Sequence, residues 1–267
     1  MRRARIGVVA VLVALLAGCG GGAAHPRRDA VNAYFVKVDA AEAPLLNRRV
    51  AIENALRTFS MSTNPPAEVK ALKQAQAEIL AAERRVAAIE PPADALKIHA
   101  DLLALLRLEA SLTGDLVLTT SYAPAFRQAL VPATPAGTTL AKQLRVAKGW
   151  NAQADAFARY SATLEPVVAK LDTLEAPPVL RPTLAGERAA LRRRVALSAE
   201  VEAALRKKDA KGANTAIRSL FAIGSDAVRT RNAEIAAAHA YNARITRVSI
   251  LTAAIAKERQ RLIKSIG

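Results

Sequence analysis

The amino-acid sequence predicts an all-α protein, an elongated bundle of about six helices. Apolar residues make up 52% of the chain but aromatic residues only 4%, because alanine and leucine, both strong helix formers, supply most of the apolar content. From Asp29 onward apolar residues recur at steps of three and four, and no segment alternates with period two. Proline and glycine stand mainly between these periodic segments, where they indicate helix ends.

The first half of the chain is predicted to form three helices. The first spans residues 29–59 and is kinked at Pro44. After a turn, the second begins near Pro65 and stops at Pro91-Pro92. The third spans residues 93–121. The predicted buried positions are Val31, Phe35, Val38, Leu45, Ile52, Leu56 and Phe59, then Val69, Leu72, Ile79, Val86 and Ile89, then Leu96, Ile98, Leu102, Leu103, Leu105, Leu106, Leu112 and Leu116.

The second half begins with a predicted long connection, which holds one short turn at residues 126–131 and is marked by Pro124, Pro132, Pro135 and Gly137. Three helices follow, at residues 138–174, 183–207 and 209–266. Pro166 is expected to kink the first of them, and Gly224 is a weak point in the last. The predicted buried positions here are Leu140, Leu144, Trp150, Phe157, Leu164, Val168 and Leu171, then Leu184, Leu191, Val195, Val201 and Leu205.

The two halves are predicted to form two related helical units, residues 29–131 and 138–267, although a single continuous domain is the alternative. A shift of 85 residues places Leu72, Ile79 and Val86 on Phe157, Leu164 and Leu171. After the Pro-Pro stops the shift becomes 89 and places Leu102 on Leu191. Any two heptad patterns match at some shift, so the sequence leaves open whether the chain is duplicated.

The charge favours an anionic partner. The formal net charge is +16, and the three arginines among the first five residues account for three of these charges, which leaves +13 on the rest of the chain. Such an excess favours contact with phospholipid headgroups or acidic envelope polymers. A solvated, arginine-rich surface is the alternative, and Arg192, Arg193 and Arg194 are predicted to point outward.

The first nineteen residues carry the most specific pattern. Arg2, Arg3 and Arg5 form a basic start, and residues 6–16 are an unbroken apolar run. This run is shorter than the roughly 20 residues that span a bilayer, and it is typical of a secretory signal peptide. It ends in Leu16-Ala17-Gly18-Cys19, an aliphatic residue and two small residues before the chain's one cysteine.

This tetrapeptide resembles the lipobox of bacterial lipoproteins. The resemblance implies that residues 1–18 are removed as a signal peptide and that the sulfur of Cys19 carries lipid. The protein would then be exported and anchored to the outer face of the cell membrane, or lie in the periplasm or at the outer membrane of a cell with two membranes. That location argues against a nucleic-acid partner. Residues 19–28 are predicted to form a flexible lipidated tether in which Arg27 and Arg28 touch anionic lipid.

Residues suited to catalysis or metal binding are few. The histidines are His25, His99 and His239, and neither of the latter two has the glutamate three residues before it that a di-iron helix bundle needs. We therefore predict no catalytic, cofactor-binding or metal-binding residue. His99 lies on an apolar stripe, which favours a role in packing over a role as a ligand. Glu234, five residues before His239, lies on another helix face.

Six polar residues also fall on the apolar stripes, and we interpret them as interhelical pairs that set register, with a polar ligand site as the alternative. They are Glu42, Arg49, Gln76, Glu83, Arg231 and Asn242. The segment from Tyr241-Asn242-Ala243-Arg244 to Leu262 is similar to the last helix of uncharacterised helical lipoproteins of GC-rich bacteria. The sequence thus predicts a non-enzymatic binding or scaffolding lipoprotein of the cell envelope with an unknown protein partner. A ligand or metal sensor near His99 is the alternative, followed by an enzyme of unrecognised type.

Overall fold

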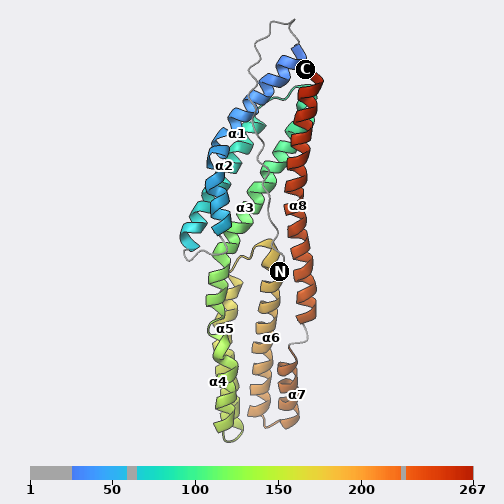
Figure 1. Cartoon of the computed structure of the whole chain (residues 1–267). Coiled ribbons are helices and arrows are strands. Elements are labelled where there is room, and N and C mark those ends of the chain that lie inside the picture. The colour runs from blue at the N-terminus through green and yellow to red at the C-terminus, as the bar shows by residue number, and fades with distance from the viewer. Residues whose placement is uncertain (1–25, 59–64, 224–226, 267) are drawn as a thin grey trace. The chain divides into compact units, whose positions relative to one another are not determined.

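The computed structural model describes residues 26–58, 65–223 and 227–266, which form helices joined by short turns and contain no strand. The predicted all-α helical bundle is thereby confirmed (Figure 1). The helices are α1 (Pro26–Thr58), α2 (Pro65–Ala87), α3 (Leu96–Leu130), α4 (Ala133–Val146), α5 (Trp150–Asp172), α6 (Arg181–Arg206), α7 (Ala210–Phe221) and α8 (Ala227–Ile266), with the single 3₁₀ turns η2 (Ala93–Ala95) and η3 (Pro178–Leu180).

The chain divides into two compact units, each built from separate stretches of sequence. Unit 1 comprises Met1–Val50, Ala77–Ala110 and Thr246–Gly267, and unit 2 comprises Ala51–Gln76 and Ser111–Ile245. These units do not coincide with the predicted division at residues 29–131 and 138–267. Sequence periodicity identifies helix faces, but it does not say that the end of α8 packs with α1.

Unit 1 is a four-helix arrangement of α1, α2, α3 and α8. Its core confirms most of the predicted buried positions, including Val31, Phe35, Val38, Ile79, Val86, Ile98, Leu102 and Leu106, and adds Leu262 from α8. Each large aliphatic side chain buried in this core contributes about 1.5–3 kcal/mol, so the core is the main source of stability in the unit. The prediction that Leu96 is buried is wrong: its side chain is 58% exposed, whereas that of Ile98, in the same first turn of α3, is 1% exposed.

Unit 2 has two adjoining apolar clusters along the α5–α6 pair. One joins Leu140, Phe157, Val201 and Leu205 to α7. The other joins the C-terminal part of α3 to α5 and α6 through Tyr122, Ala129, Leu164, Leu171, Leu184 and Leu191. Arg188 of α6 donates to the carbonyl oxygens of Leu171 and Leu174, both at 3.0 Å, and so satisfies acceptors at the end of α5.

The predicted long connection after residue 121 is wrong. Helix α3 continues through Pro124 to Leu130, and α4 begins at Ala133 and includes Pro135 and Gly137. Proline removes one helical hydrogen bond, but the continued helix buries Tyr122 and Ala129 against α5 and α6, which offsets that loss. Helices α1 and α5 likewise continue across Pro44 and Pro166.

The predicted single helix at residues 138–174 is also wrong, since α4 ends at Val146 and α5 begins at Trp150. Helix α4 ends where Ala147 adopts an extended backbone, and Gly149, which precedes α5, has φ +83°, a conformation that favours glycine. The side chain of Trp150, predicted to be buried, is 37% exposed because it opens α5 at this turn.

Two further boundaries differ from prediction. The predicted last helix at residues 209–266 is two helices, with α7 ending at Phe221 and α8 beginning at Ala227, while Gly224 itself lies outside the described residues. The predicted tether of residues 19–28 overlaps α1, which begins at Pro26.

The order of elements repeats along the chain at an offset of 85 residues. Helix α5 begins and ends 85 residues after α2, η3 lies 85 residues after η2, and α6 begins 85 residues after α3. This offset describes where the elements begin; the apolar positions that the shift of 89 aligns, such as Leu102 and Leu191, are both buried. The repeated order is what a duplicated helix–turn–helix would produce.

Candidate functional site

The predicted lipid-bearing residue lies outside the described residues. Cys19 and His25 precede the described part of the chain, and the side chain of Arg49 is also outside it. Lipidation of Cys19 therefore stays a prediction that depends on the sequence alone.

His99 lies in a polar and aromatic cluster of unit 1. Its Nδ1 is 3.2 Å from the hydroxyl of Tyr34, and the two rings are 5.9 Å apart between centroids. Burial lowers the pKa of His99 and so favours the neutral ring. Burial, with a smaller contribution from Glu42, raises the pKa of Tyr34 to about 12. These contacts give His99 a packing role at the α1–α3 contact.

The same cluster contains a charged pair that the sequence did not predict. Arg259 of α8 donates to both carboxylate oxygens of Asp39, at 2.9 and 2.7 Å, and its guanidinium carbon lies 4.7 Å from the centre of the Phe35 ring. Within the described residues, no three histidine, cysteine, aspartate or glutamate side chains come together as metal ligands would.

The polar residues predicted on the apolar stripes have different environments. Glu83 of α2 accepts a hydrogen bond of 2.9 Å from Arg107 of α3, which is an interhelical pair of the predicted kind. The amide of Gln76 lies against Gly114 of α3. Arg231 and Asn242 are exposed on α8.

The segment that begins at Tyr241 docks α8 onto α3 within unit 2. Arg244 donates to Asp115 at 2.6 Å and to the hydroxyl of Ser111 at 2.8 Å. Burial, followed by the charge of Asp115, raises the pKa of Tyr241. His239 is exposed nearby. Glu234 instead accepts a hydrogen bond of 2.7 Å from Thr183 of α6.

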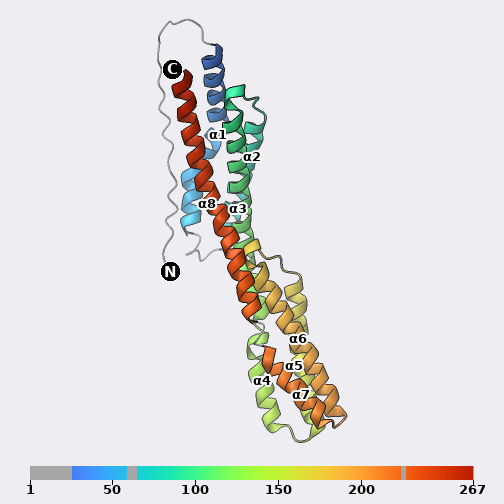
Figure 2. The same ribbon diagram turned by 90° about the vertical axis from the view of Figure 1, so that its right-hand side faces the viewer.

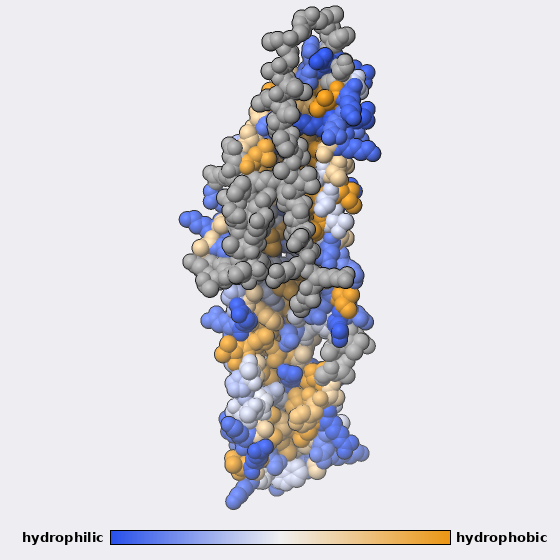
Figure 3. Space-filling model, in the orientation of Figure 1, coloured by the Kyte–Doolittle hydropathy of each residue, from blue (hydrophilic) through white to orange (hydrophobic). Residues whose placement is uncertain are grey.

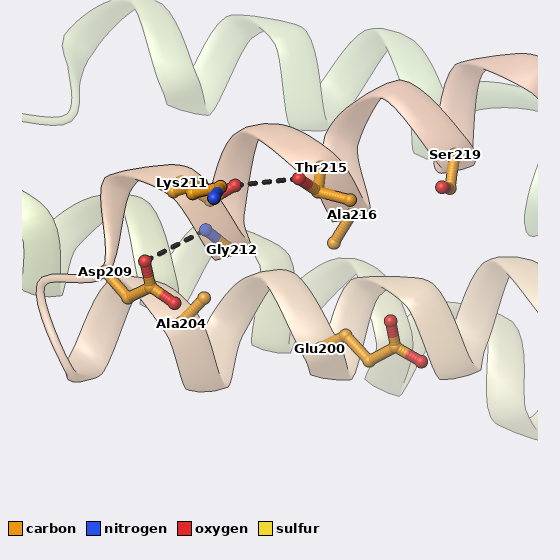
Figure 4. Close-up of a pocket in the computed structure, with 8 residues that line it drawn as sticks. All are labelled: Glu200, Ala204, Asp209, Lys211, Gly212, Thr215, Ala216 and Ser219. Atoms are coloured by element: carbon orange, nitrogen blue, oxygen red, sulfur yellow. Dashed lines mark hydrogen bonds between the residues drawn. The ribbon is translucent and has the colours of Figure 1, made fainter.

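An open surface depression of about 450 Å³ lies between the C-terminal half of α6 and α7 (Figure 4). Asp209 caps α7 by accepting from the backbone nitrogen of Gly212 at 2.9 Å, while Lys211 and Glu200 line the two sides. Aspartate is a favoured N-cap because its carboxylate satisfies a free N–H of the first turn. Asp209 is therefore engaged in capping the helix.

Two turns of unit 2 lie at the same end of the unit, the α4–α5 turn and the α6–α7 turn (Figures 1 and 2). The apolar cluster that joins α4, α5, α6 and α7 holds this arrangement, and a surface ion pair of Asp155 in α5 with Arg206 in α6, at 3.0 Å, lies beside it. Six exposed basic residues belong to these turns and the helix ends beside them, and we call them the basic tip: Lys142, Arg145, Lys148, Lys207, Lys208 and Lys211.

The basic tip differs from the basic residues that the sequence analysis singled out. Arg27 pairs with Asp94 at 2.6 Å and Arg192 with Asp172 at 2.8 Å. The tip residues make no such ion pair within the described residues, because the neighbouring Asp155 and Glu202 both bind Arg206. This cluster is not apparent from the sequence, since it depends on bringing together residues that are about 60 positions apart.

Apolar side chains accompany the basic tip. Val146 is 77% exposed at the end of α4, and Trp150 opens α5 four residues later. Hydrophilic surface and scattered apolar surface both appear over this end of unit 2 (Figure 3). An exposed aromatic ring among unpaired cations is a combination suited to an anionic surface with an apolar interior.

Comparisons of the chain with models of known protein families, with curated proteins and with solved structures find no match. No helix in the described part of the chain is both long enough and apolar enough to cross a lipid bilayer.

Proposed function

We propose that this chain is a lipid-anchored, extracytoplasmic lipoprotein that acts as a non-enzymatic binding or scaffolding protein at the cell envelope. The observation that carries the proposal is the order of the first nineteen residues, a basic start, a short apolar run and Leu16-Ala17-Gly18-Cys19. A diacylglyceryl group on Cys19 supplies two acyl chains, and two chains hold a protein stably on a membrane where one does not.

The basic tip supports a binding role with an anionic partner. Exposed cations that have no internal partner lose little on binding, whereas a paired cation such as Arg27 must first break an ion pair. Anionic headgroups, anionic envelope polymers and an acidic protein surface all fit this chemistry. A ligand sensor at His99 is less favoured, because Nδ1 of that ring already faces the Tyr34 hydroxyl.

Metabolic labelling tests the anchor. Cells expressing the protein are fed a clickable fatty acid, and label on the protein is compared with label on Cys19→Ala and on Gly20→Ala, which keeps the cysteine. We expect label on wild type and Gly20→Ala and none on Cys19→Ala. An uncleaved leader could still hold Cys19→Ala on the membrane, so the label and not the location is the readout. Wild-type protein without label would refute the anchor.

A further inference from the structure

We propose that the basic tip of unit 2 binds the surface of an anionic phospholipid bilayer, with its lysine and arginine side chains on headgroup phosphates and with Trp150 and Val146 entering the interfacial layer. This inference deepens the proposed function by naming the partner, and it rests on that function only because export brings the tip to a membrane surface.

Positive charge predominates at the two turns. None of the six cations forms an ion pair within the described residues, since Asp155 and Glu202 bind Arg206, and Asp209, which lies between Lys208 and Lys211, caps α7. Each lysine or arginine near an anionic membrane contributes a similar favourable increment, and these increments add up over a cluster. Paired cations of unit 1, such as Arg259, are less available to a membrane because they already bind a carboxylate of the protein.

The exposed apolar side chains at the tip favour a bilayer over a soluble polyanion. A polymer of phosphate groups would contact the cations and gain nothing from an exposed valine. In a bilayer, the ring of Trp150 fits the headgroup level, where tryptophan is enriched. Gly149, with φ +83°, reverses the chain between Val146 and Trp150 and so keeps both side chains at the turn, beside Lys148.

Packing holds the two turns in place before binding. Leu140 of α4, Phe157 of α5 and Val201 of α6 share one apolar cluster, and the Asp155–Arg206 pair links α5 to the end of α6. The cations are therefore presented together before binding, which reduces the entropy lost when they meet a charged surface.

Trp150 is the only tryptophan of the chain, so its fluorescence reports on the tip alone. The purified protein is incubated with vesicles of phosphatidylcholine and with vesicles that also contain phosphatidylglycerol, each with and without brominated acyl chains. We expect a blue shift and bromine quenching only with phosphatidylglycerol, weakened by salt. An acyl anchor would attach the protein to both vesicles, so attachment is not the readout. Emission that is unchanged by phosphatidylglycerol would overturn the proposal.

A matched pair of variants tests whether the tip itself is responsible. The triple variant Lys207→Gln, Lys208→Gln and Lys211→Gln removes three tip charges. The control triple variant removes three exposed lysines of unit 1 and has the same net charge: Lys37→Gln, Lys257→Gln and Lys264→Gln.

The tip variant should lower the ratio of bilayer-embedded to solvent-exposed Trp150 about 100-fold, and the control by about twofold or less. Equal losses would overturn the proposal in favour of general charge attraction. Soluble poly(glycerol phosphate) that binds the tip while vesicles leave Trp150 unquenched would overturn it in favour of a polymer. Absence of fatty-acid label on Cys19 would remove the proposed anchor but leave this result unaffected, so the two failures are distinguishable.

Discussion

Arg259 and Asp39 form a bidentate ion pair between the last helix and the first, with nitrogen–oxygen distances of 2.9 and 2.7 Å, although they are 220 residues apart in sequence. The guanidinium also lies over the Phe35 ring, so that one side chain makes a charged and an aromatic contact. A planar guanidinium is suited to both contacts at once, whereas an ammonium is not.

We expect Arg259→Lys and Asp39→Asn each to lower the free energy of unfolding by about 1–2 kcal/mol, because the first loses the two parallel hydrogen bonds of the guanidinium and the second loses the negative charge and one acceptor. Urea denaturation followed by circular dichroism measures this. Arg247→Ala, an exposed arginine of α8 without an ion pair in the described residues, is the control and should change stability by less than about 0.5 kcal/mol. A double-mutant cycle that shows no coupling between positions 259 and 39 would contradict the contact.

The raised pKa of Tyr34 predicts a loss of folding stability at alkaline pH. Burial raises its pKa in the folded protein to about 12 from an ordinary value of 10.0. The unfolded chain therefore loses this proton first, so the stabilisation is present below pH 10 and is lost as pH rises toward 12. We expect Tyr34→Phe to lose less stability than wild type over that interval. Identical pH dependence of the two proteins would contradict the burial of the hydroxyl.

At two glycines of unit 2, substitution by alanine should have different effects on stability. A Cβ at Gly137 of α4 meets nothing within 4 Å, so Gly137→Ala should raise stability by about 0.5–1 kcal/mol through helix propensity. A Cβ at Gly186 of α6 would lie 2.7 Å from Cγ2 of Thr230 in α8. Gly186→Ala should therefore be neutral or destabilising.

Thermal denaturation compares these variants. Adding Thr230→Ala to Gly186→Ala removes the two closest atoms and should recover the stabilisation that Gly137→Ala shows. A Gly186→Ala protein as stable as Gly137→Ala on its own would contradict the close approach of α6 to α8.

The periodic pattern predicted the helices and most of the core but not their ends. Val31, Val38, Leu164 and Leu171 are buried as expected, because a stripe at three- and four-residue steps reflects burial directly. Pro124 indicates a connection after residue 121, yet α3 continues through it and packs Ala129 against α5 and α6, which offsets the lost hydrogen bond. Gly149 indicates the break between α4 and α5, but the apolar stripe through residues 138–174 favoured one continuous helix.

The charged features were less predictable than the core. Periodicity placed Arg259 and Asp39 on helices but not on neighbouring ones, because the pairing of α8 with α1 depends on tertiary packing. The basic tip could not be predicted from the sequence for the same reason. Lys148 and Lys207 are separated by the whole of α5 and α6, and they share one end of unit 2 only once these two helices pack antiparallel.

The identity of the mature N-terminus tests the account most directly. Intact-mass and peptide mass spectrometry of the protein purified from the envelope should find a chain that starts at Cys19, with a diacylglyceryl group on its sulfur. A mature chain that starts at another residue, or one that starts at Cys19 with an unmodified thiol, would contradict the proposed lipoprotein.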